Sequence, residues 1–123
     1  MLIVRNEHDP LNQFVSEHFR AAEFRCKCGD CRITLISEEL LRRLERVRCD
    51  VGMPLLISSG YRCQAHNRAL GGAEYSFHMS GNAADVLFPQ EPLDIERLFA
   101  AFRRHFPFSY MGQGFIHGDT RGI

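Results

Sequence analysis

SFHMSGNAAD, residues 76–85, combines a histidine, a carboxylate and several small residues within ten positions. His78 and Asp85 lie seven residues apart, with Gly81 and two alanines between them. The pattern predicts a loop carrying the histidine that enters a buried strand, residues 83–88, whose start carries the aspartate. Small residues at such a junction let backbone and ligand approach each other closely. His78 and Asp85 are therefore candidates for one site.

A second histidine and carboxylate follow near the end of the chain, in FIHGD at residues 115–119. Asp119 comes two residues after His117, so on a strand the two side chains share a face. Two imidazoles and a carboxylate (His78, His117 and Asp85) form a common catalytic zinc set that leaves the fourth position to water or substrate. The same spacing also fits histidines that are satisfied by hydrogen bonds in a half-buried sheet, and both interpretations stay open at this point.

The apolar spacing and the cap residues outline the other elements. We expect a helix from Asp9 to about Phe19, and a second helix that begins after Ser37 as N-cap and ends at Gly52 and Pro54. Further patterns predict a strand at 55–58, a short helix at 64–70, a helix at 92–106 and a strand or hairpin at 108–120. In the helix at 92–106, the residues expected to face inward are Leu93, Ile95, Leu98, Phe99 and Phe102. Helices first and strands later favour an α+β domain.

Composition limits the class of protein. The 123 residues are 45% apolar and 24% charged, which fits one domain spanning residues 1–123. Fifteen basic and fifteen acidic residues cancel, so nucleic acid is not expected as a partner. No run approaches the roughly 18 apolar residues of a membrane span. The start MLIVRNEHDP lacks a basic region and a long apolar core, so we expect synthesis in the cytoplasm without a signal peptide. We also expect a monomer.

These segments together resemble the zinc D-alanyl-D-alanine carboxypeptidase family, which includes phage L-alanyl-D-glutamate endopeptidases and shares its fold with the hedgehog signalling domain. The matching positions are SGYR at 59–62, Asn67, Gly71-Gly72, Ser76-x-His78-x-x-Gly81-x-Ala83-x-Asp85 and His117-x-Asp119. EFRCKCGDC at 23–31 resembles the small phage and prophage branch. The resemblance covers about residues 20–122 and implies an antiparallel sheet with packed helices and zinc in a cleft.

The resemblance also implies roles for individual residues. His78, Asp85 and His117 match the family's zinc ligands, and Arg62 matches an arginine that faces the scissile carbonyl or the substrate carboxylate. A fixed guanidinium can stabilise a developing oxyanion, although Arg62 also fits an exposed turn residue with a structural salt bridge. Ser76 matches a serine that donates a hydrogen bond near the substrate, and it fits equally as a cap for the loop holding His78.

The implied reaction is zinc-dependent hydrolysis, by a metal-activated water, of peptide bonds involving D-amino acids in bacterial peptidoglycan. Carboxypeptidase and endopeptidase action both remain open. A phage or prophage endolysin released by a holin to act on the cell wall fits this reading, as do a murein-recycling enzyme and a tail-associated lysin.

One position departs from the family pattern. Many members carry Glu or Asp three residues before the last zinc histidine, as general base, and this chain has Gly114 there, beside Gln113. Asp119 is the nearest carboxylate in sequence and fits either a general base or an orienting partner of His117. We favour the orienting role. The departure also supports the alternative of a catalytically silent, zinc-bearing binding module of the same fold.

Five cysteines, an odd number, argue against a disulfide-stapled protein. Cys26, Cys28 and Cys31 form C-x-C-x-x-C, which has the spacing of a metal knuckle but needs a fourth ligand such as Cys49, Cys63 or a histidine. The simpler interpretation is a loop of reduced cysteines that are partly packed in the core. A nucleic-acid-binding knuckle rests on these residues alone and leaves SFHMSGNAAD unexplained.

Overall fold

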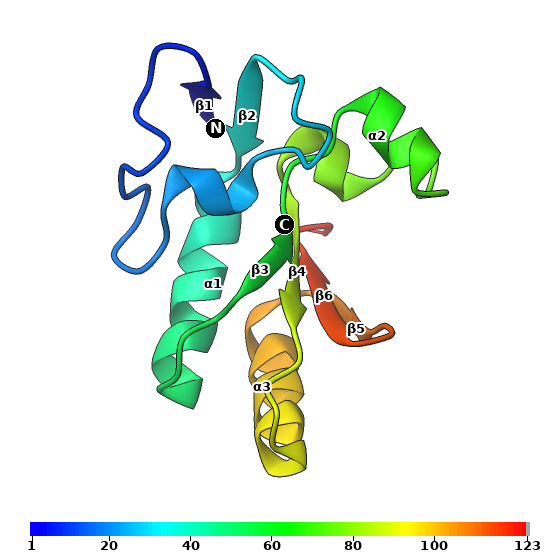
Figure 1. The fold of residues 1–123 in the computed structure, drawn as a ribbon. Helices are drawn as coiled ribbons and strands as arrows, with labels where there is room; N and C mark the ends of the chain where they lie inside the picture. The colour runs from blue at the N-terminus through cyan, green and yellow to red at the C-terminus, as the bar shows by residue number, and fades with distance from the viewer. Residues whose placement is uncertain (123) are drawn as a thin grey trace.

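The predicted strand that carries Asp85 lies inside a four-stranded antiparallel sheet. The computed structural model describes residues 1–122 (Figure 1). The sheet has the order β3-β4-β6-β5, with bounds Ile57–Ser59, Ala83–Leu87, Phe115–Asp119 and Phe108–Met111. A separate two-stranded antiparallel sheet pairs β1, Leu2–Arg5, with β2, Ile33–Ile36. The expected α+β class with an antiparallel sheet is therefore confirmed.

Three α-helices and two 3-10 turns connect these strands. The α-helices are α1, Glu38–Val51, α2, Gln64–Ala69, and α3, Pro92–His105, and the 3-10 turns are η1, Ala21–Phe24, and η2, Phe77–Ser80. The predicted limits of α1 are confirmed, because Ser37 Oγ accepts a hydrogen bond from the backbone N–H of Leu40 at 3.3 Å and Gly52 adopts a φ of 65° after the last turn. No described helix is long and apolar enough to cross a membrane.

Helices α1 and α3 pack against each other, and α3 also lies against β5 and β6. Gly118 permits this contact, since a Cβ there would lie 2.8 Å from the Phe102 ring. Ala84, Val86 and Ile116 belong to the helix-covered core. Because side chains alternate along a strand, the residues between them, Asp85 and His117, emerge on the opposite face of the sheet.

The helix expected at residues 9–19 is wrong. These residues form turns and a single antiparallel bridge between Phe14 and Arg20. Their backbone groups are used across the turn, with Val15 N–H donating to Phe19 O at 2.9 Å and Ala21 N–H donating to Gln13 O at 2.9 Å, instead of within a helix. The three- and four-residue spacing of apolar side chains therefore reflects the packing of an irregular segment, in which Phe19 is buried and Phe14 is 57% exposed.

Two smaller expectations also change. Leu93 was expected to face inward but is 72% exposed, because the first turn of α3 extends beyond the strands (Figure 1). Strand β1 was not predicted, since four residues at the start of the chain show little alternation.

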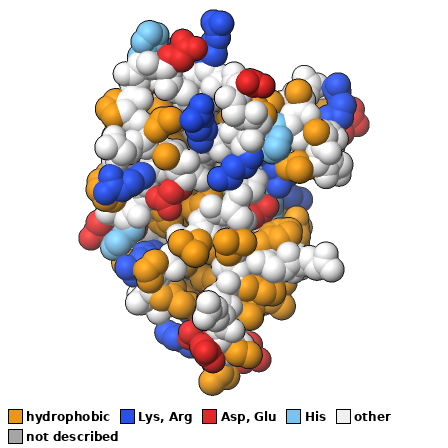
Figure 2. Space-filling model, viewed as in Figure 1, with side chains coloured by type: hydrophobic (Ala, Val, Ile, Leu, Met, Phe, Trp, Pro, Cys, Tyr) orange, Lys and Arg blue, Asp and Glu red, His pale blue; other side chains and the backbone are white. Residues whose placement is uncertain are grey.

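Figure 2 shows hydrophobic side chains gathered over the four-stranded sheet and α3, while basic and acidic side chains are interspersed over the rest of this face.

Candidate metal centre

His78, Asp85 and His117 meet on the face of the sheet opposite the helical core. One ligand atom from each lies within 4.8 Å of the others, and all three residues are buried. Asp85 and His117 are direct partners in the antiparallel β4–β6 pairing, and His78 comes from the short turn η2 that precedes β4. The fold thus brings together three residues that are up to 39 positions apart in sequence, 117 minus 78.

Two neighbours fix the orientation of the His78 ring. Ser76 Oγ caps η2 by accepting from the backbone N–H of His78 at 3.2 Å, which is the capping alternative raised for this serine. His78 Nδ1 lies 2.7 Å from the carbonyl oxygen of Gly60, so it carries the proton and leaves the lone pair on Nε2. That Nε2 is buried and has no hydrogen-bond partner among residues 1–122, although Asp85 Oδ1 lies 3.3 Å away.

His117 is held from both sides. Its Nε2 lies 2.7 Å from Asp119 Oδ2, and its Nδ1 lies 2.9 Å from Asp85 Oδ1. A proton on Nε2, donated to Asp119, leaves the lone pair of Nδ1 directed at Asp85. Two imidazole lone pairs and a carboxylate then face one another without a donor between them. Such a set of acceptors is stabilised by a cation, and imidazole nitrogen with carboxylate oxygen is a donor set that suits zinc.

Charge around Asp85 keeps that carboxylate ionised. Burial raises the pKa of Asp85, but hydrogen bonds from His117 and His78, and their positive charge when both rings are protonated, outweigh it and lower the pKa to about 2. Arg62 Nη2 lies 3.3 Å from Asp85 Oδ2 and forms an ion pair with it. The other guanidinium nitrogens of Arg62 donate to Ser59 Oγ at 3.1 Å and Asn67 Oδ1 at 3.3 Å. The guanidinium is therefore fixed beside the three acceptors.

Asp119 lies behind His117 and is fully buried. Its Oδ1 accepts from the backbone N–H and the Nε of Arg121, at 3.1 and 2.9 Å, and its Oδ2 accepts from Arg121 Nη2 at 2.8 Å. Burial raises the pKa of Asp119, but the hydrogen bonds from Arg121 and His117 lower it overall. The geometry places this carboxylate on the far nitrogen of His117 rather than among the three converging acceptors.

A cleft of about 520 Å³ opens next to the three residues. His78, Asp85 and His117 line it together with Arg62 and Ser76, and Asp119 is not among its lining residues. Within the described chain, Asp85 and the exposed Glu74 are the carboxylates on its wall. The site is therefore open on one side, as a substrate-binding metal centre requires.

Two neighbours of the site, one aromatic and one basic, were not predicted from the sequence. Tyr110 pairs with His117 across β5 and β6 and stacks on its ring, with centroids 4.6 Å apart and planes at 21°. Arg121 joins Asp119 and also lies over the Phe108 ring, 3.8 Å from its centroid. Neither carries a motif of its own. Only the strand register, which is a long-range property, brings Tyr110 to the site.

The arrangement defines a class: an α+β protein whose antiparallel sheet presents a buried His, Asp and His set to an open cleft. The model of the family Peptidase M15 matches residues 17–119. The chain belongs to the peptidase M15 family, and this makes it a zinc metallopeptidase in general terms. No curated protein matches the chain.

Proposed function

We propose that this chain hydrolyses peptide bonds involving D-amino acids in bacterial peptidoglycan, as a carboxypeptidase or an endopeptidase. The observation that carries the proposal is the convergence of ligand atoms from His78, Asp85 and His117 at the wall of the cleft, where the buried His78 Nε2 has no hydrogen-bond partner among residues 1–122. The resemblance of residues 76–85 to the D-alanyl-D-alanine carboxypeptidases supplies the substrate class. Membership of the peptidase M15 family supports the zinc chemistry. The peptidoglycan substrate is our proposal.

The three converging residues would hold the zinc. Zinc at such a site supplies a Lewis acid for a carbonyl and a hydroxide nucleophile near neutral pH. Gly60 O and Asp119 accept the proton on the other ring nitrogen of His78 and His117, so His78 Nε2 and His117 Nδ1 are the nitrogens that can offer lone pairs to the ion. Asp85 contributes a carboxylate that stays ionised well below neutral pH.

Arg62 is the residue we assign to the substrate. Its guanidinium lines the cleft and is fixed by Asp85, Ser59 and Asn67. A preorganised cation at this position stabilises the oxyanion that forms as the carbonyl is attacked. We assign Asp119 to positioning, because its carboxylate holds the Nε2 of His117 and is fully buried. Ser76 holds the turn of His78 and reaches the cleft wall, where it can contact substrate.

A digest of purified muropeptides, read by mass spectrometry, tests the proposal. The zinc-loaded chain should cleave beside a D-amino acid, a chelator should abolish cleavage, and added zinc should restore it. His78→Ala should not cleave, whereas His8→Ala, which changes an exposed histidine, should match the wild type. Chelator-insensitive cleavage would refute the metal mechanism. A zinc-loaded wild type that binds muropeptides without cutting them would instead establish the silent binding module, which Gly114 in the general-base position favours.

A further inference from the structure

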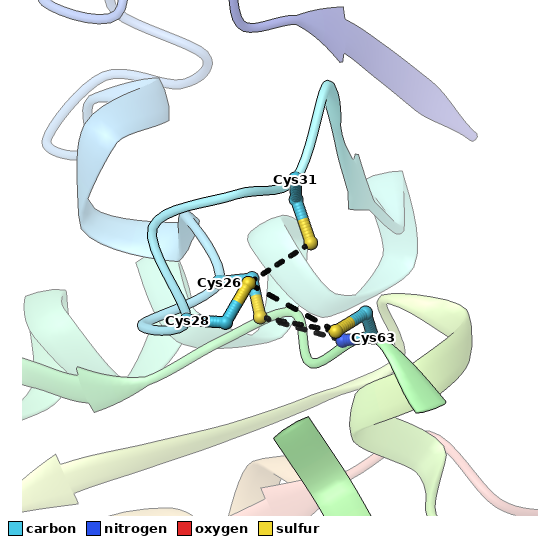
Figure 3. Close-up of side chains that lie close together, drawn as sticks. All are labelled: Cys26, Cys28, Cys31 and Cys63. Atoms are coloured by element: carbon cyan, nitrogen blue, oxygen red, sulfur yellow. Dashed lines mark hydrogen bonds between the residues drawn. The ribbon is translucent and has the colours of Figure 1, made fainter. Parts of the chain in front are cut away.

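The sulfur atoms of four cysteines converge at a second place, apart from the cleft. Cys26, Cys28 and Cys31 come from the loop between η1 and β2, and Cys63 caps the N-terminus of α2 (Figure 3). All four sulfurs lie within 4.8 Å of one another. The fifth cysteine, Cys49, is exposed on α1 and does not belong to this group. Cys63 therefore lies where the fourth ligand missing from the C-x-C-x-x-C spacing would be needed.

We propose that these four cysteines bind a structural zinc ion, distinct from the metal centre in the cleft. The separations between the sulfur atoms agree with this. In a tetrahedron with zinc–sulfur bonds of about 2.3 Å, sulfurs are about 3.8 Å apart. Here the Cys26–Cys63, Cys28–Cys31 and Cys28–Cys63 sulfurs lie 3.8, 3.4 and 3.9 Å apart. Disulfide-bonded sulfurs lie at about 2.05 Å.

Backbone N–H groups point at three of the four sulfurs and would stabilise them as thiolates. The N–H of Asp30 lies 3.3 Å from the sulfur of Cys28, that of Cys63 lies 3.4 Å from Cys26, and that of His66 lies 3.4 Å from Cys63. Zinc binding by four thiols releases four protons and leaves a net charge of minus two on the cluster. These hydrogen bonds offset part of that charge.

Four protein thiolates leave no position for water or substrate, so the site is structural rather than catalytic. It joins two segments that are 37 residues apart, counted from Cys26 to Cys63. Only the folded chain holds these two segments side by side, so metal binding there contributes directly to the free energy of folding.

The cluster also fixes the segment that carries Arg62. Three successive N–H groups are bonded to different parts of the fold: Tyr61 to Phe24 O at 2.9 Å, Arg62 to His78 O at 3.1 Å and Cys63 to Cys26 sulfur at 3.4 Å. Gly60 lies so close to η1 that a Cβ would approach Phe24 Cα to 2.7 Å. A zinc ion on Cys63 therefore holds the backbone next to the guanidinium that faces the cleft.

Metal analysis of the full chain, purified under reducing conditions, tests the inference independently of peptidase activity. The wild type should contain two zinc ions, and His78→Ala should retain one. Cys28→Ser should lose one, while Cys49→Ser should keep both. With cobalt in place of zinc, His78→Ala should show intense sulfur-to-cobalt charge-transfer absorption and the visible bands of a tetrahedral ion.

The His78→Ala protein is decisive even if Cys28→Ser does not fold, because it leaves all four thiols intact. A His78→Ala protein without metal or without charge-transfer absorption would overturn the second site. The second site would also be overturned by an intact mass showing that the four cluster cysteines have lost their thiol hydrogens and form two disulfides. Loss of muropeptide cleavage alone, with two zinc ions still bound, would refute the proposed activity and leave this site standing.

Discussion

Replacing Asp119 by asparagine separates the two roles that its position in sequence allowed. The carboxylate accepts four hydrogen bonds: two on Oδ1 from Arg121, one on Oδ2 from Arg121 Nη2 and one on Oδ2 from His117 Nε2. An asparagine has a single acceptor oxygen and turns its NH2 group toward the remaining donors. Either His117 or Arg121 therefore loses its acceptor in the variant.

The expected magnitude follows from that loss. Removing the carboxylate partner of a metal-binding imidazole weakens metal affinity by about 10- to 100-fold, which corresponds to about 1.4 to 2.8 kcal/mol. Competition with a chromophoric zinc chelator measures it. Arg121→Gln is the matched control, since it removes the cation and leaves the carboxylate on His117, and its zinc affinity should stay within about threefold of the wild type.

Three results would distinguish the outcomes for Asp119→Asn. Weaker zinc binding with an unchanged acidic limb of the pH–rate profile supports the positioning role. Unchanged zinc affinity with loss of that limb would make Asp119 the general base. Full zinc affinity together with full activity would refute both roles. Glu74, the other carboxylate at the cleft besides Asp85 in the described chain, would then be the candidate general base.

Three further perturbations test other parts of the structure. Arg62→Ala should lower kcat by roughly 100-fold and leave zinc content intact, because the guanidinium acts on charge that develops during attack; a change confined to KM would make it a substrate anchor. Gly60→Ala should reduce the free energy of unfolding by about 2 kcal/mol, since its Cβ would meet the backbone of Phe24 at 2.7 Å, and an unchanged denaturant midpoint would contradict that contact. The pKa of Glu45 is raised by burial but lowered overall by hydrogen bonds from Ser16 and His18. A lowered folded-state pKa adds stability above the unfolded value of about 4.3 and loses it as pH falls through the folded value. Glu45→Gln should therefore cost about 1 kcal/mol at neutral pH, and the difference should vanish in acid; a difference that persists there would refute the assignment.

The sequence by itself determined the elements that carry strong local signals. The N-cap Ser37, the apolar stripe and Gly52 fixed α1, and the small residues after His78 marked the entry into β4. The grouping of His78, Asp85 and His117 into one set came from the resemblance of residues 76–85 and 117–119 to the carboxypeptidase family, since spacing alone left a second interpretation open. In contrast, the helix predicted from apolar periodicity at residues 9–19 was wrong, because the backbone hydrogen bonds of this segment close across a turn.

Tertiary structure alone decided how these residues act together. The β4–β6 register sets Asp85 opposite His117 and the β5–β6 register adds Tyr110, and a register cannot be read from spacing within one strand. The same holds for the cysteines, because the sequence left Cys49, Cys63 and a histidine all open as the fourth ligand of a metal knuckle. The turn after β3 brings Cys63 to the loop of Cys26, 37 residues earlier, because Gly60 allows the close backbone contact with η1 that no local pattern encodes.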